Sequence, residues 1–263
     1  MTPFDGVGLF CFYYDGVGTP LTPAEASAYK QAGVDYALIK VSDGMTGGGA
    51  VVLQQMQAAW DGGLRVIPYG FFYSTWSGAE QLAILKAAQG GGERTYCADV
   101  ESAISPAGLA GVGVSTWGNP LPTSLLNTGH PGEPSIGLLA DVGVAAYLPQ
   151  AYGGAWGVSP AQSIAIMEAS YRACNLGSLT KPLIPTSDQG TGLLEFAKAA
   201  KAIGCNGIIA FRHGANNVSP QSFAGVAEIF TPVTPTPSPN PSPAVLVSGE
   251  TYQTPKGDLV TFS

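Results

Sequence analysis

The feature that most constrains the fold is an alternation of apolar, strand-like runs with amphipathic, helix-like segments between residues 9 and 214. Near-continuous apolar strands separated by helices are typical of a parallel sheet that is covered on its outer face. Eight such units in about 250 residues predict a closed (β/α)8 barrel of the TIM type. The eight strand candidates are Leu9 to Tyr14, Tyr36 to Val41, Arg65 to Tyr73, Thr95 to Glu101, Gly111 to Trp117, Val144 to Tyr152, Pro182 to Ser187 and Gly207 to Arg212.

Helical patterns fill most of the spaces between these strands, and several of them are followed by a glycine, as helix C-termini prefer. They cover Pro23 to Ala32, Val51 to Trp60, Gly78 to Gln89, Pro160 to Cys174 and Gly192 to Ile203. One crossover is short. Only Ser102 to Ala110, with Pro106 among them, separate the fourth and fifth strands, whereas a parallel crossover needs about a dozen residues or more. We therefore expect the fourth helix to be missing or reduced to a turn.

The C-terminal region differs in composition from the barrel. Residues 231–243 are rich in proline and predict an extended, semi-rigid linker, so we place the barrel domain at residues 1–230. Residues 244–263 predict a small hairpin, with strands from Ala244 to Val247 and from Asp258 to Phe262. An isolated hairpin of this size is marginally stable in water. We expect this tail to attach to a larger assembly, to oligomerise, or to dock onto the barrel.

Charge and hydropathy exclude two classes of partner. The net charge is −7 with only 11 Lys and Arg and no basic run, which argues against nucleic acid. No apolar run approaches the roughly 20 residues that span a bilayer, so no membrane contact is expected. The N-terminus also lacks the basic and apolar regions of a signal peptide.

The best lead to function is the pair of acids that ends the fourth strand, Asp99 and Glu101. Side chains alternate across a strand, so both acids share one face with Cys97. Two acids on a largely buried face are costly unless they have a function. The alternative is an ion network inside the barrel, in which Lys40 or Arg212 neutralises the pair.

Several ordered segments give the chain a resemblance to the family 25 glycoside hydrolases, the lysozyme-type barrels of phage endolysins and bacterial autolysins, as a divergent branch. The resemblance covers residues 6 to about 230. The matching segments run from Ala32 to Gly44, Ala59 to Gly70, Ala98 to Glu101, Leu148 to Tyr152 and Lys181 to Thr186.

By this resemblance the family's Asp-x-Glu motif falls on Asp99 and Glu101, which makes Glu101 the general acid and Asp99 the assisting carboxylate. Glycoside cleavage needs such a pair, one acid to protonate the leaving oxygen and one to stabilise the oxocarbenium-like centre. The chain departs from the family at two further acidic positions, where it has Phe10-Cys11-Phe12 and Ala210-Phe211-Arg212-His213. Asp15 and Asp188 are the candidates to replace these acids from loops.

Other polar and aromatic residues near the predicted strand ends are candidates for substrate binding, because aromatic faces stack on sugar rings and polar groups bind hydroxyls. The alternative for each is ordinary packing in the barrel. A long Pro/Gly-rich loop, residues 119–140, is a candidate substrate wall. The candidate substrate-binding residues are Lys40, Asp43, Tyr69, Phe71, Tyr73, Trp117, Gln150, Tyr152, Asp188 and His213.

The sequence indicates no metal site and no cofactor. It has two histidines, His130 and His213, and neither a His-Glu-x-x-His motif nor the Lys-Ser/Thr of a phosphate loop. The four cysteines are widely spaced, which favours buried free thiols, although Cys174 and Cys205 lie near the ends of successive predicted helices and could pair.

Two functional hypotheses follow. The first is a glycoside hydrolase-like, phage-encoded lysin that cleaves the polysaccharide of bacterial peptidoglycan, carried in a virion or released from the host cytoplasm at lysis. The second is a non-catalytic carbohydrate-binding barrel, such as a virion structural protein or adhesin.

Overall fold

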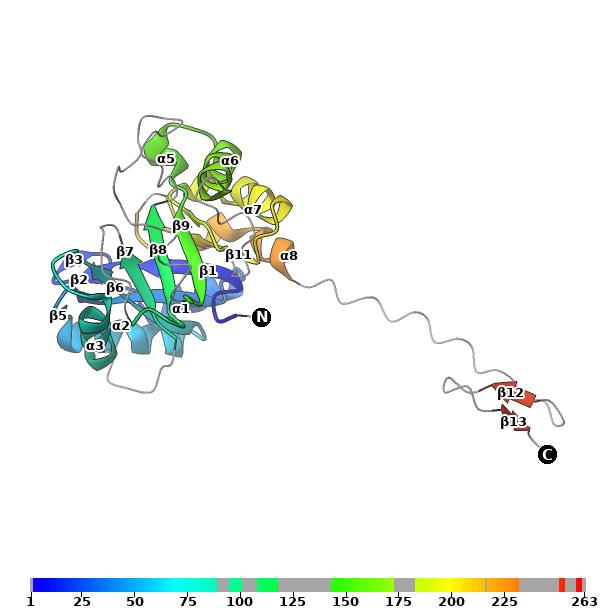
Figure 1. The fold of residues 1–263 in the computed structure, drawn as a ribbon, viewed down its shortest axis with the longest axis horizontal. Helices are drawn as coiled ribbons and strands as arrows, with labels where there is room; N and C mark the ends of the chain where they lie inside the picture. Colours follow the sequence, from blue (N-terminus) through cyan, green and yellow to red (C-terminus); the bar gives the residue numbers. More distant parts are fainter. Residues whose placement is uncertain are drawn as a thin grey trace. The chain divides into compact units, whose positions relative to one another are not determined.

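Eight parallel strands close into a barrel in the first of the two compact units of the chain, Met1–Thr231; the second unit is Pro232–Ser263 (Figure 1). The structure is a computed structural model. It describes residues 2–88, 95–100, 108–117, 143–172, 183–215, 217–231, 251–253 and 259–261.

The strands follow one another around the barrel in chain order, and β1 closes it by pairing with both β4 and β11. The predicted (β/α)8 fold is thus confirmed. The eight barrel strands are β1 (Gly6–Cys11), β4 (Tyr36–Asp43), β6 (Arg65–Phe72), β7 (Cys97–Val100), β8 (Gly113–Trp117), β9 (Ala146–Gln150), β10 (Thr186–Ser187) and β11 (Gly207–Ala210).

Two short hairpins extend the carboxyl ends of the first two barrel strands. The predicted first strand, Leu9 to Tyr14, divides: β1 ends at Cys11, and β2 (Tyr13–Tyr14) folds back antiparallel onto β3 (Val17–Gly18). A turn at Asp15-Gly16, both with positive φ, reverses the chain there. In the same way β5 (Thr46–Gly47) pairs antiparallel with β4.

Helices surround the barrel, and the five predicted helical segments are all present with ends within a few residues of the expected ones (Figure 1). Helix α1 shows why its sequence starts where it does, since Thr22 and Glu25 form a reciprocal capping box and Pro23 occupies the first turn. The helices are α1 (Pro23–Gln31), α2 (Gly49–Asp61), α3 (Gly78–Ala88), α5 (Gly153–Trp156), α6 (Pro160–Tyr171), α7 (Leu193–Ala202) and α8 (Val226–Phe230), with 3-10 turns η2 (Gly190–Gly192) and η3 (Pro220–Phe223).

Short elements escaped prediction. The sequence did not indicate α5, α8 or the 3-10 turns, because segments of five residues or fewer carry little periodicity. The crossover that we expected to be short connects Val100 to Gly113, and its residues 101–107 lie outside the described part of the chain. None of the described helices has the length and apolar character of a membrane-spanning helix.

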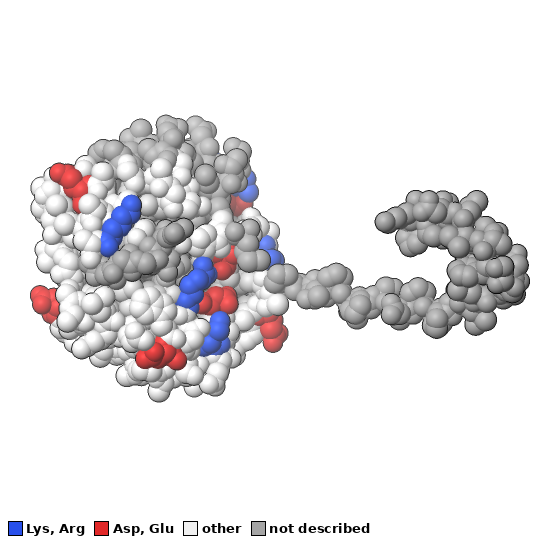
Figure 2. All heavy atoms as spheres, turned by 90° about the horizontal axis from the view of Figure 1, so that it is seen from below, with Lys and Arg blue, Asp and Glu red and all other residues white. Residues whose placement is uncertain are grey.

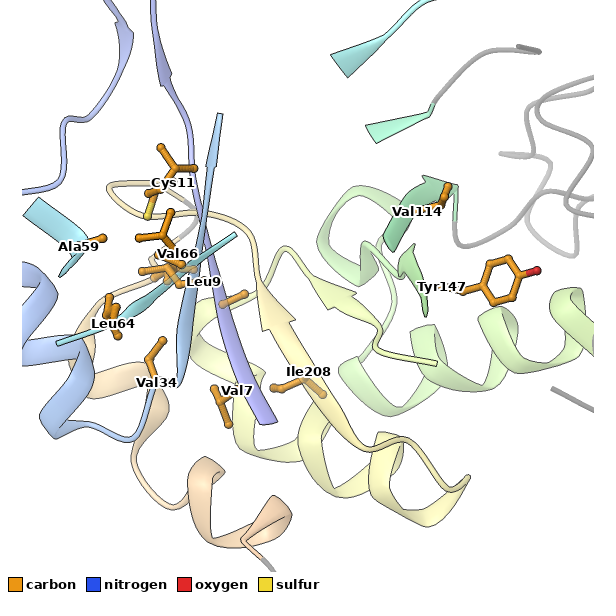
Figure 3. Packing of buried hydrophobic residues seen from close by; sticks show 14 of the residues in the cluster. Val7, Leu9, Cys11, Val34, Ala59, Leu64, Val66, Val114, Tyr147 and Ile208 are labelled. Carbon is orange, nitrogen blue, oxygen red and sulfur yellow. The ribbon is translucent and has the colours of Figure 1, made fainter. Parts of the chain in front are cut away.

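The outer face of the barrel packs against the helices in the larger of two apolar clusters. Outward residues of β1, namely Val7, Leu9 and Cys11, meet helix and loop residues such as Val34 and Ala59 (Figure 3). On the far side, Tyr147 of β9 points toward the helices and its ring packs edge-on to Tyr171 of α6. This layer holds the helices on the barrel.

The barrel interior forms a second, separate cluster of inward residues. At the amino end Phe4 and Tyr36 fill the interior, and the Tyr36 hydroxyl donates a hydrogen bond to the Phe4 carbonyl oxygen at 2.9 Å. Two glycines leave the room for these rings. A Cβ at Gly8 would lie 2.5 Å from the Tyr36 ring, and one at Gly113 would lie 2.3 Å from the Phe4 ring.

In the second unit, β12 (Thr251–Gln253) pairs antiparallel with β13 (Leu259–Thr261). A tail hairpin was predicted, and β13 lies within its predicted second strand. The first strand lies at 251–253, later than the predicted Ala244 to Val247, which is outside the described residues.

Surface charge is sparse in the described part of the chain. On the face drawn in Figure 2, Lys and Arg side chains are interspersed with Asp and Glu, and no basic patch forms there.

Candidate active site

The inward residues at the carboxyl ends of the strands form a polar and aromatic mouth that contains Asp99. Asp99 lies two residues after Cys97, which belongs to the interior cluster, and it is level with Phe71 of β6 and Ser115 of β8. Alternation along β7 therefore directs Asp99 inward, on the same face as Cys97. Glu101 lies just beyond the described end of β7.

Gln150 of β9 holds Asp99 in place. Its amide nitrogen Nε2 donates to Asp99 Oδ1 at 3.0 Å and lies 3.4 Å from Ser115 Oγ. Gln150 is 2% exposed and Ser115 is fully buried. The neighbouring Thr186, level with Gln150, is also buried, and its hydroxyl has no hydrogen-bond partner among the described residues. Asp99 thus lies beside uncharged polar groups, and its amide partner comes from two strands away.

An apolar floor lies beneath these polar groups. Tyr69 is buried and packs edge-on against Phe10, with ring centroids 4.9 Å apart. Burial raises the pKa of the Tyr69 hydroxyl well above 10, and the nearby Asp99 charge raises it further. Burial also raises the pKa of the Cys97 thiol well above its usual value, again with a contribution from Asp99. Both groups are therefore neutral, and the predicted substrate-binding residue Tyr69 lies in the floor.

A β-bulge in β4 brings Lys40 and Asp43 together. Lys40 is level with Tyr69, but the register then shifts, so that Ser42 is level with Gly70 and Asp43 with Phe71. The extra residue turns Asp43 to the same side as Lys40. Lys40 Nζ lies 3.2 Å from Asp43 Oδ2. Lys40 is 5% exposed, so Asp43 neutralises a cation that is almost out of contact with water.

Aromatic rings extend from this ion pair to the rim. Phe71 and Tyr73 have centroids 4.7 Å apart, and Tyr73 meets Trp76 edge-on at 6.3 Å. The Tyr73 hydroxyl donates to Asp43 Oδ1 at 2.7 Å. Tyr73 and Trp76 are 39% and 38% exposed, which is high for large aromatic side chains. Exposed rings beside a carboxylate are suited to stacking on sugar rings.

The opposite part of the mouth is formed after β9 and β11. Tyr152 stacks on Phe211 with centroids 5.4 Å apart, and Phe211 meets Phe10 at 5.8 Å. The Arg212 guanidinium lies over Phe12 at 4.7 Å and over Phe211 at 5.5 Å. Phe10 and Phe211, which lie within the two segments where the family that the sequence resembles carries acids, are thus packed aromatics in this chain. Sequence reasoning had not assigned Ser115, Thr186, Phe12 or Phe211 to the site.

Two predicted substrate-binding residues are occupied with structural contacts. Asp188 accepts hydrogen bonds from the backbone N–H groups of Gly154 and Ala155, at 2.9 and 2.8 Å. It borders a polar hollow of about 630 Å³ beside α5 and η2. His213 is buried against α1, where its Nδ1 lies 3.2 Å from the Tyr29 hydroxyl. These contacts give His213 a structural role between β11 and α1.

The remaining predicted residues divide between described and undescribed positions. Trp117 ends β8, level with Gln150, and its side chain is not described. Asp15 is an exposed turn residue between β2 and β3. His130 and the predicted wall at residues 119–140 lie outside the described part of the chain, as does Cys174.

The other three cysteines, Cys11, Cys97 and Cys205, are free and buried. No three His, Cys, Asp or Glu side chains come together as a metal site would require, within the ranges that the structure describes.

No protein-family description matches this sequence, and no curated protein matches it. Solved structures do match the fold. The catalytic domain of a hyperthermophilic chitinase from Pyrococcus furiosus matches with a TM-score of 0.58 and 14% identity, over 88% of this chain and 96% of that one. An endo-beta-1,4-mannanase from Thermotoga petrophila matches with a TM-score of 0.53 and 11% identity, over 89% of this chain and 78% of that one. At these identities the likeness shows a shared barrel fold.

Proposed function

We propose that this protein is a glycoside hydrolase of the lysozyme type that acts on the polysaccharide of bacterial peptidoglycan, with Glu101 as general acid and Asp99 as assisting carboxylate. The observation that carries the proposal is the position of Asp99, which faces inward at the carboxyl end of β7 and is held by the Gln150 amide. In (β/α)8 enzymes this end of the barrel is where active sites lie.

The contacts of Asp99 favour a catalytic role over a structural ion network. Lys40 pairs with Asp43, and no ion pair within 4.0 Å joins Arg212 to a carboxylate of the described residues. Neither Lys40 nor Arg212 is therefore ion-paired with Asp99 within 4.0 Å. A carboxylate that accepts an amide hydrogen bond, as Asp99 does from Gln150, can stabilise positive charge on a sugar ring.

The chemistry would divide between the two acids. Glu101, two residues after Asp99 in the sequence, would protonate the glycosidic oxygen as the bond breaks. Asp99, deeper in the mouth, would stabilise the oxocarbenium-like ring. The exposed rings of Tyr73 and Trp76 would stack on neighbouring sugars. Two solved structures that share the fold bear the names of polysaccharide-acting enzymes, a chitinase and a mannanase, which supports this class of substrate.

The direct test compares the parent protein with Glu101→Gln and Asp99→Asn on purified peptidoglycan, by release of reducing ends. Both changes keep the side-chain size and remove the charge. We expect each to lower the rate by about 100-fold or more, since loss of a general acid or of a charge-stabilising group has that effect. Glu228→Gln, the same change at an exposed residue of α8, is the control. Equal release by all four proteins would refute the assignment.

A second candidate is a glycan-binding barrel without catalysis, in a phage virion or adhesin. It is favoured by the packed pair Phe10 and Phe211, which belong to the two segments that lack the acids of the family that the sequence resembles. This candidate predicts glycan binding without reducing-end release between about pH 4 and 8, a range that covers the usual working pH of catalytic carboxylates. Turnover that Glu101→Gln abolishes would exclude it.

A further inference from the structure

Arg212 is a cation of the mouth that the proposed chemistry does not use. It follows β11, and its guanidinium lies 4.7 Å from the Phe12 ring centre and 5.5 Å from that of Phe211. Phe211 is itself stacked on Tyr152. Packing against rings that are fixed by further packing limits the rotamers of Arg212, so its guanidinium is preorganised.

The hydrogen-bond donors of this guanidinium have no acceptor in the described protein. Arg212 is partly buried, yet its side chain makes no hydrogen bond and no ion pair with any residue that the structure describes. An arginine carries five N–H donors and a permanent charge. When aromatic rings cover the faces of the guanidinium, its edges remain free to bind a planar pair of oxygens.

A second cation lies close to the first. Lys40 Nζ is 4.6 Å from the centre of the same Phe12 ring, but Asp43 neutralises it. Asp99 takes the Gln150 amide as a partner. Asp99 and Arg212 both influence the pKa of Tyr69 in the floor of the mouth. Burial and the Asp99 charge raise this pKa, and the Arg212 charge, a smaller influence, lowers it. Arg212 thus belongs to the same mouth as Asp99.

We propose that Arg212 binds a carboxylate of the glycan, so that this mouth selects an acidic sugar next to the sugar that Asp99 contacts. The inference rests on the proposed function for its ligand class. Two carboxylates have the required chemistry: the lactyl group of muramic acid from which the stem peptide has been removed, and the C6 carboxylate of a uronic acid. Both offer the two coplanar oxygens that a guanidinium binds in a bidentate manner.

The test uses two matched pairs of probes that differ only in charge. The first pair is peptidoglycan glycan strands freed of stem peptides, with lactyl carboxylates intact or converted to methylamides. The second is a uronic-acid oligosaccharide and its carboxyl-reduced form. Dissociation constants are measured by calorimetry with full-length Glu101→Gln protein to prevent turnover. Arg212→Met and Arg212→Lys are added to this background.

We expect the charged member of one pair to bind about 10-fold more tightly or better, because a charge-assisted hydrogen bond to a partly buried group contributes that much. Which pair shows the preference identifies the source of the carboxylate. Arg212→Met should remove the preference, and a urea unfolding midpoint close to that of the background protein shows that the variant is folded. Arg212→Lys should retain only part of it, since an ammonium lacks the planar fork.

Arg65→Met is the matched control, because Arg65 lies over the Tyr36 ring at the opposite end of the barrel. It should keep the full preference. The inference is wrong if neither pair shows a preference, if no probe binds, or if the preference survives Arg212→Met. Reducing-end release by the parent without a charge preference would retain the hydrolase and end this inference. A charge preference without any reducing-end release would support the role of Arg212 and refute the hydrolase.

Discussion

The two ends of the barrel interior are built by the same strands but differ in almost every physical respect. At the amino end Phe4 and Tyr36 are fully buried, and Gly8 and Gly113 make room for their rings. At the carboxyl end the inward positions hold Asp99, and its neighbours are amides, hydroxyls and partly exposed rings. The same alternation therefore places packed rings at one end and polar groups at the other, and the carboxyl end is where active sites lie in (β/α)8 enzymes.

The largest expected contrast comes from the same substitution at each end, Phe4→Ala and Phe71→Ala. Phe4→Ala should lower the free energy of unfolding by about 3–5 kcal/mol, because it empties a fully buried site. Phe71→Ala should cost roughly 1–2 kcal/mol, since its ring is only partly buried, and should instead weaken glycan binding. Urea unfolding measures both. Equal losses at the two ends would contradict the division between them.

The second contrast concerns Gln150, which is as buried as the amino-end residues but serves Asp99. Gln150→Met keeps the volume and removes an N–H donor to the carboxylate. We expect activity on peptidoglycan to fall about 10- to 100-fold, the value of one hydrogen bond to a charged group. Asp99→Asn combined with Gln150→Met should add little to either change alone, because both act on one contact. Additive losses would mean that Gln150 acts elsewhere.

The third test returns to the amino end. At Gly113 a new Cβ would lie 2.3 Å from the Phe4 ring, so Gly113→Ala should cost about 2 kcal/mol by overpacking. The smaller side chain of Phe4→Leu should relieve the clash. The double variant is therefore expected to lose less stability than the sum of the two single changes. Thermal or urea unfolding of the four proteins gives this coupling, and simple additivity would show that the ring does not occupy this space.

The sequence predicted the parts of both ends that depend on periodicity. Eight apolar runs predicted the barrel, and strand alternation placed Asp99 on the same face as Cys97. It could not predict the bulge at Val41 and Ser42, because a bulge adds one residue without changing composition; yet the bulge is what pairs Lys40 with Asp43.

The sequence also could not predict side-chain contacts between residues that are far apart in the chain. Gln150 was predicted to bind substrate, and the structure shows that its amide donates a hydrogen bond to Asp99, two strands away. His213 was assigned to the site because it follows a strand end, but its ring packs against Tyr29 of α1 instead. Such assignments depend on which way a side chain leaves the last strand residue, and alternation no longer applies there.

The smallest effect should come from the capping box of α1, which lies outside both ends of the interior. Thr22→Ala should lower the free energy of unfolding by about 1 kcal/mol at pH 7, through loss of the cap. Burial acts to raise the pKa of Glu25, but hydrogen bonds from the Thr22 side chain and backbone outweigh it and lower that pKa below its ordinary 4.5.

A carboxylate whose pKa is lower in the folded state than in the unfolded state stabilises the fold when the pH is above its unfolded-state pKa. This contribution is lost as the pH falls through its folded-state pKa. The stability difference between parent and Thr22→Ala should therefore be constant from neutral pH down to near 4.5 and shrink below it. Urea unfolding across this range measures it. Because neither Thr22 nor Glu25 is among the proposed sugar-binding residues, we expect glycan affinity to be unchanged, and a change in affinity would show that the capping box also serves function.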